Sequence, residues 1–112
     1  MVFKNRKGFK IIKPKNQFYQ LCYESLKKVP KGKVTTYKEI AKSLGINAYR
    51  AVGNAMHNNK NAPIIPCHRV VKSNGEVGGY VKGKKLKIKM LRAEGIEIKN
   101  DRIDLKKFFY KF

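Results

Sequence analysis

Two short helices predicted on either side of Gly45 constrain the fold of this chain more than any other feature. Thr36, followed three residues later by Glu39, has the pattern of a capping box and starts the first helix. Gly45 ends that helix, because glycine readily adopts the left-handed conformation that follows a helix C-terminus. Asn47 then opens a second helix, which continues through Met56. Two short helices joined by a tight glycine turn indicate a helix-turn-helix.

Further helices are predicted before and after this pair. Asn16 is a suitable cap for a helix through Val29, since apolar residues recur there at helical spacing, and Cys22 lies on its buried face. A basic helix is predicted over 82–94, closed by Gly95. Three of its residues are expected to face inward: Leu86, Met90 and Leu91.

The fold class expected from this order is mainly α with small β elements, a winged-helix-like helix-turn-helix domain. At 112 residues the chain is long enough for one domain with a modest core. Residues 1–15 are basic and are predicted as a strand or arm, and residues 16–112 as the folded domain. A turn at 100–101 and a short helix capped by Asp104 bring the tail back to the body of the domain.

The charge of the chain indicates its class of partner. It has 27 Lys and Arg residues against 7 Asp and Glu, a formal net charge of +20. Because so large a charge repels itself, a polyanionic partner is expected, with nucleic acid ahead of an anionic membrane surface. No stretch is apolar enough to span a bilayer, and the lysine-rich start lacks the apolar centre of a signal peptide. A cytoplasmic location is expected.

Cys67 is the candidate nucleophile. A thiol reacts as the thiolate, and His68 and Arg69, which follow it directly, favour that form. Two prolines just ahead of it forbid a regular helix and indicate a fixed, largely buried turn. The chain's two cysteines are too few for a disulfide framework and indicate a reducing compartment. With two histidines and no C-x-x-C spacing they are a poor zinc set, so no metal or other cofactor is expected.

The second helix of the predicted helix-turn-helix is unusually smooth. Ala48, Ala51 and Gly53 leave Arg50 as its long basic side chain. Such small residues either pack on the domain core or let the helix approach a DNA backbone or a narrow groove closely. A sequence-specific regulator is disfavoured, because the helix offers few polar side chains that could read base edges.

Six blocks of residues occur in the order and spacing of a known family. The chain resembles the C-terminal catalytic domain of the O6-alkylguanine-DNA alkyltransferases, in a minimal single-domain form, over roughly residues 16–98. A Pro-Cys-His-Arg match alone is a weak signal, but six blocks in register are a strong one. The blocks are residues 35–37, 50–56, 66–70, 79–80 and 94–95, and Asn59.

The resemblance implies single-turnover DNA repair, in which the protein transfers an alkyl group from guanine O6 onto its own cysteine. Cys67 is then the nucleophile, His68 the general base acting through a bridging water, and Glu94 the residue that orients His68. Tyr37 is expected to hydrogen-bond to guanine O6, and Asn59 to act as a hinge. The other expected contacts with the base or the DNA are Ala48, Arg50, Ala51, Gly53, Met56, Val70, Gly79, Tyr80 and Val81.

The partner that the resemblance implies is double-stranded DNA containing O6-alkylguanine. A damaged base must leave the duplex before a buried thiol can reach it. On this hypothesis the smooth helix enters the minor groove, about 6 Å wide, and Arg50 fills the gap left by the base. A monomer is expected, with no membrane partner.

Three features depart from the family pattern. The N-terminal α/β domain that usually precedes this module is expected to be absent, residues 82–89 are richer in lysine than usual, and Tyr49 is bulkier than the usual small residue. The alternative function is that of an alkyltransferase-like protein, which binds alkylated DNA without transfer. Those proteins carry Trp where Cys67 stands, so this residue favours transfer.

Overall fold

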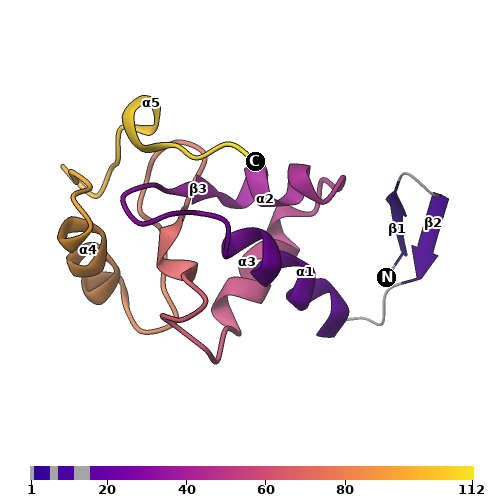
Figure 1. Cartoon of the computed structure of the whole chain (residues 1–112). Helices are drawn as coiled ribbons and strands as arrows, with labels where there is room; N and C mark the ends of the chain where they lie inside the picture. The colour runs from indigo at the N-terminus through magenta and orange to yellow at the C-terminus, as the bar shows by residue number, and fades with distance from the viewer. Residues whose placement is uncertain (1, 6–7, 12–15) are drawn as a thin grey trace.

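The computed structural model describes residues 2–5, 8–11 and 16–112 as a mainly helical chain with two small sheets (Figure 1). Its elements, in chain order, are β1 (Val2–Asn5), β2 (Gly8–Ile11), α1 (Asn16–Leu26), β3 (Thr35–Thr36), α2 (Tyr37–Ser43), α3 (Tyr49–His57), the 3₁₀ turn η1 (Cys67–Arg69), β4 (Val70–Val71), α4 (Lys84–Ala93) and α5 (Leu105–Phe108). The expected fold class, mainly α with small β elements around a helix-turn-helix, is confirmed.

The segment predicted as a basic strand or arm contains two strands. β1 pairs with β2 in an antiparallel hairpin, with Val2 opposite Ile11 and Asn5 opposite Gly8. The rest of that segment, residues 1, 6–7 and 12–15, lies outside the described residues.

The helix-turn-helix is built from α2 and α3. The Thr36 side chain accepts a hydrogen bond from the Glu39 backbone N–H at 3.0 Å, so the predicted cap is confirmed. Gly45 has a φ of +73° and its N–H bonds back to Lys42, which ends α2 as expected. The prediction for α3 was wrong at its start. Ala48, not Asn47, is the N-cap, and no side chain caps this helix.

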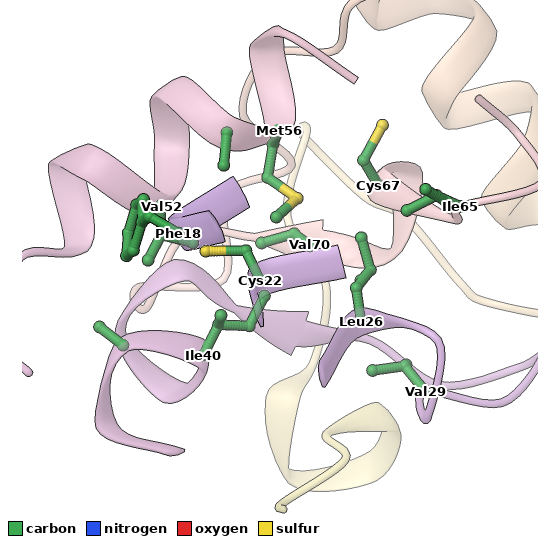
Figure 2. Packing of buried hydrophobic residues seen from close by; sticks show 12 residues of the cluster. Phe18, Cys22, Leu26, Val29, Ile40, Val52, Met56, Ile65, Cys67 and Val70 are labelled. Atoms are coloured by element: carbon green, nitrogen blue, oxygen red, sulfur yellow. The ribbon is translucent and has the colours of Figure 1, made fainter. Parts of the chain in front are cut away.

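A hydrophobic cluster between α1, α2, α3 and η1 supports the helix-turn-helix. α1 ends at Leu26 rather than at the predicted Val29, because the chain there turns through tighter hydrogen bonds, although Val29 is still buried. Figure 2 shows how the cluster's side chains meet. Its buried members are Phe18, Cys22, Leu26, Val29, Ile40, Ala41, Val52, Ala55, Met56, Ile65, Cys67 and Val70.

A parallel pair of two-residue strands separates this cluster from a second one. β3 pairs with β4, with Thr35 opposite Val70 and Thr36 opposite Val71. Successive strand residues point to opposite faces, so Val70 joins the first cluster and Val71 the second. The second cluster lies under α4 and the C-terminal segment, and consists of Val34, Val71, Val77, Leu91, Ile96, Ile98, Ile103 and Phe108.

The prediction for α4 was wrong in its inward face. Leu91 is buried, but Leu86 is exposed and Met90 only half-buried, whereas Lys87 is fully buried. Lys87 and Leu91 are four residues apart and therefore lie on one face, while Leu86 and Met90 are each about 100° around the helix from them. The helix also begins at Lys84, two residues later than predicted, after Gly83.

The turns of the tail follow the expectations. Asn100 and Asp101 have positive φ values, and Asp104 caps α5 through a bond to the Lys106 N–H. Within the described ranges, every helix is too short or too polar to cross a membrane.

Candidate active site

Cys67 begins η1 and lies at the wall of a small hollow. Its side chain is 3% exposed, and its N–H bonds to the Ile65 carbonyl at 2.8 Å, which fixes the turn. Figure 2 shows its sulfur at the margin of the first cluster, directed away from Val70. The hollow has a volume of about 140 Å³, close to that of a cavity that admits benzene (about 150 Å³). It is lined by Tyr37, Gly53, Met56, His57, Cys67, Gly79, Tyr80 and Val81.

The buried His68 and the half-buried Glu94 form a hydrogen-bonded pair. His68 Nε2 lies 2.8 Å from Glu94 Oε2, and the histidine is 2% exposed. A carboxylate accepts, so Nε2 carries the proton and Nδ1 has a free lone pair. Nδ1 is buried and has no partner among the described residues. Burial lowers the pKa of His68, although Glu94 partly offsets this, so the neutral ring is a proton acceptor near neutral pH.

Arg69 holds the carboxylate of Glu94 in place, a role that the sequence reasoning missed. Its Nε and Nη2 donate to the two oxygens of Glu94, both at 2.9 Å, and its Nη1 donates to the Val29 carbonyl at 3.0 Å. Burial alone would raise the pKa of Glu94, but hydrogen bonds from Arg69 and His68 outweigh it and lower the pKa. Glu94 is therefore ionised and its orientation is fixed.

The thiol of Cys67 is protonated in the resting site. Burial raises its pKa, while the Asn59 side chain and the positive charges of Lys87 and Lys82 partly offset that rise. A thiol in this state needs a base to become a nucleophile. The neutral His68, next in sequence, is the candidate base.

Lys87 is a second feature of the site that the sequence reasoning missed. Its Nζ donates to the Val70 carbonyl at 2.7 Å and to the Gly79 carbonyl at 2.9 Å, and its side chain is 0% exposed. Burial lowers its pKa to about 7. Lys87 thereby joins β4, the strand that follows Cys67, to the loop at Gly79, which also lines the hollow. The signal in the sequence was its spacing of four from Leu91, which its charge concealed.

Three further polar side chains belong to the site: Asn59 lies just after α3, and Tyr37 and Tyr80 line the hollow. Asn59 is buried, and its Nδ2 donates to the Ile65 carbonyl at 2.8 Å, which ties the end of α3 to the loop before Cys67. Burial raises the pKa of both tyrosines, so both hydroxyls are protonated donors. The hydroxyl of Tyr80 is buried and has no partner among the described residues.

The structure thus brings together many, but not all, of the residues singled out from the sequence. Six of them line the hollow together with Cys67: Tyr37, Gly53, Met56, Gly79, Tyr80 and Val81. His57, which the sequence did not suggest, also lines it. Arg50 lies in an adjoining hollow, while Ala48 and Ala51 lie on the first turn of α3 or its cap and line neither. Gly53 has no atom within 4 Å of the place where a Cβ would be, so the helix leaves open space there.

The described residues show no arrangement that would bind a metal ion. Within 2–5, 8–11 and 16–112 there is no group of three or more His, Cys, Asp or Glu side chains placed to do so.

The sequence of residues 17–96 matches the family model described as 6-O-methylguanine DNA methyltransferase, DNA binding domain. The chain belongs to this family. The resemblance inferred from the sequence is confirmed.

Two curated relatives are named as methyltransferases. A bifunctional methyltransferase/endonuclease of Picrophilus torridus is 45% identical over 91 residues, which cover 80% of this chain and 30% of that protein. A methylated-DNA–protein-cysteine methyltransferase of Saccharolobus solfataricus is 51% identical over 76 residues, covering 68% of this chain and 49% of that protein. The chain therefore spans less than half the length of these relatives.

Solved structures agree with the family and the fold. The Atl1 protein of S. pombe, in complex with damaged DNA containing O6-carboxymethylguanine, has a TM-score of 0.80 at 28% identity, over 89% of this chain and all of that one. The O6-methylguanine-DNA methyltransferase of Pyrococcus kodakaraensis has a TM-score of 0.66 at 41% identity, over 76% of this chain and 48% of that one.

Proposed function

We propose that this protein repairs DNA by transferring the alkyl group of O6-alkylguanine irreversibly to Cys67. The observation that carries the proposal is the buried Cys67 thiol at the wall of a hollow that is large enough for an aromatic ring. The next residue, His68, is hydrogen-bonded to Glu94. This order of nucleophile, base and orienting carboxylate is the one that activates a weak nucleophile.

We infer the following reaction from this site. The thiol proton of Cys67 passes through a bridging water to Nδ1 of His68, and Glu94 stabilises the imidazolium. The sulfur electron pair forms a bond to the alkyl carbon as the bond from that carbon to O6 breaks. Tyr37, a protonated donor in the hollow, hydrogen-bonds to O6 as negative charge develops there. The products are an S-alkylcysteine and a guanine, which takes up the proton released by the thiol.

The same proposal assigns the remaining contacts to DNA. Backbone carbonyls of Cys67 and Val70 accept from the exocyclic amine of the base. The Val70 carbonyl already accepts from Lys87, but a carbonyl oxygen has two lone pairs, so one remains for the base. α3 enters the minor groove, with Ala48 and Ala51 against the backbone, and Arg50 fills the gap left by the extruded base. Residues 16–112 act as the alkyltransferase domain, as a monomer, in a reducing compartment that keeps Cys67 free.

A second candidate is a sensor that binds alkylated DNA without transfer. The similarity of the whole Atl1 chain, solved with alkylated DNA, to 89% of this one favours it. The presence of Cys67 favours transfer instead, since a thiol in this position can accept the alkyl group.

Mass spectrometry after incubation with O6-methylguanine duplex separates the two candidates. We expect the wild-type protein to gain one methyl group on the peptide that contains Cys67, and Cys67→Ser to gain none while it still binds the duplex. The serine hydroxyl is a far weaker nucleophile than a thiolate. A wild-type protein of unchanged mass, bound to the lesion, would identify a sensor.

A further inference from the structure

A second hollow adjoins the Cys67 hollow. It has a volume of about 470 Å³ and shares Tyr37 and Gly53 with the first. The rest of its wall comes from the first turn of α2, the first turn of α3 and the turn after β4. These residues are Lys38, Tyr49, Arg50, Lys72, Ser73 and Asn74.

The charge of this second hollow suits a phosphate. Lys38, Arg50 and Lys72 are cationic, and its wall contains no carboxylate. Lys72 lies 3.8 Å from Glu76, but both side chains are exposed and a pair of that length contributes little. Cations on an open wall are therefore available to a polyanion.

Tyr49 gives the same hollow an aromatic surface. It is the first residue of α3 and is 52% exposed, although large apolar side chains are mostly buried among residues 17–112. Gly53, four residues further along α3 and on the same face, has no side chain that could cover the ring of Tyr49. An exposed ring among cations is the arrangement by which proteins hold an unstacked nucleotide, with the base on the ring and the phosphate on the cations.

We propose that the second hollow is a subsite for the nucleotide next to the lesion, whose base stacks on Tyr49 and whose phosphate is bound by Lys38 and Lys72. The inference rests on the proposed function in one respect, that the damaged base occupies the Cys67 hollow. When that base leaves the duplex, the base on each side of it loses a stacking partner, and Arg50, which fills the gap, replaces that partner for one of them. Tyr49, on the wall of the adjoining hollow, lies where it can replace it for the other.

The test uses the full chain carrying Cys67→Ser, so that no alkyl group is transferred during the measurement. Each duplex contains O6-methylguanine and, beside it, 2-aminopurine, whose emission rises when it unstacks. One duplex has it on the 5′ side and another on the 3′ side. We expect Tyr49→Ala to weaken binding about five- to tenfold and to raise the emission in at least one duplex. Tyr49→Phe keeps the ring and should match the parent. Equal binding and emission for the two variants would overturn the subsite.

Salt dependence separates stacking from charge. Lys38→Gln and Lys72→Gln should each reduce the slope of log K against log salt by about 0.9, whereas Tyr49→Ala should leave the slope unchanged. A reduced slope for Tyr49→Ala would contradict a stacking role. Leu86→Ala is the matched control, because Leu86 is an exposed apolar side chain that lines neither hollow.

The wild-type protein distinguishes this inference from the proposed function. If it gains a methyl group but Tyr49→Ala binds as Tyr49→Phe does, the subsite is wrong and the transfer stands. If its mass does not change while the tyrosine effect is present, the transfer is wrong and the subsite stands.

Discussion

Lys87, the buried lysine of α4, should make the stability of the folded protein depend on pH. Lys87 is charged at about pH 10.5 and below in an unfolded chain, but its pKa in the folded protein is about 7. Between these values the unfolded state binds more protons, so stability should rise with pH across the window.

We expect Lys87→Met to lose this pH dependence. From about pH 7 to pH 10.5 the wild type should gain up to about 1.4 kcal/mol of unfolding free energy per pH unit relative to the variant. Urea denaturation at several pH values measures the difference. Lys85→Met, an exposed lysine on the same helix, should follow the wild type. Parallel pH profiles for the two methionine variants would show that Lys87 does not titrate in this window.

Residue-scale predictions from the sequence were possible where residues are neighbours in the chain. Cys67 and His68 are adjacent, so their place in one turn could be predicted. Lys87 and Arg69 act across the fold, on carbonyls and a carboxylate 8 to 40 residues away. No local sequence pattern reveals such partners. Because both side chains are charged, the sequence favoured a solvent-exposed position for each.

At the scale of elements, α3 has a glycine, Gly53, where the helix lines the Cys67 hollow. Glycine in a helix costs about 1 kcal/mol relative to alanine, and nothing lies within 4 Å of a Cβ at Gly53. The glycine is therefore not required by packing. It leaves the hollow free.

We expect Gly53→Leu to fold at least as stably as the wild type and to lose activity. The leucine side chain would extend into the Cys67 hollow, which Gly53 lines, and exclude the base. Methyl transfer from duplex DNA should fall about 10²-fold, since small misplacements have effects of that size, while the melting temperature does not fall. Gly53→Ala, which adds a methyl group alone, should be as stable and more active than Gly53→Leu. Full activity in Gly53→Leu would show that the base does not enter there.

The elements themselves were largely predictable because their ends carry local signals. The Thr36 cap, Gly45 and the Asp104 cap each act within a few residues and were correctly placed. The start of α3 and the face of α4 were not. Ala48 has no capping side chain, and the orientation of α4 is set by carbonyls from two other segments.

At the scale of the whole molecule, the net charge of +20 should dominate encounters with the proposed DNA partner. Binding to undamaged duplex should fall about 10³-fold or more between 50 and 200 mM salt, as for proteins that make at least six phosphate contacts. Methyl transfer from the free modified base should change little over that range, because no phosphate is involved. Titrations of a labelled duplex and mass spectra with the free base measure the two quantities. A shallow salt dependence for the duplex would contradict a polyanionic partner.

Glu94 links His68, the proposed base, to the framework, because the same carboxylate binds His68, anchors Arg69 and accepts weakly from the Gly32 N–H at 3.4 Å. Arg69 continues this chain of contacts to the residues after α1 through Val29. A loss of repair in a Glu94 variant would therefore mix impaired deprotonation with a loosened scaffold. Activity assays at this position need a parallel measure of folded protein before any rate is attributed to chemistry.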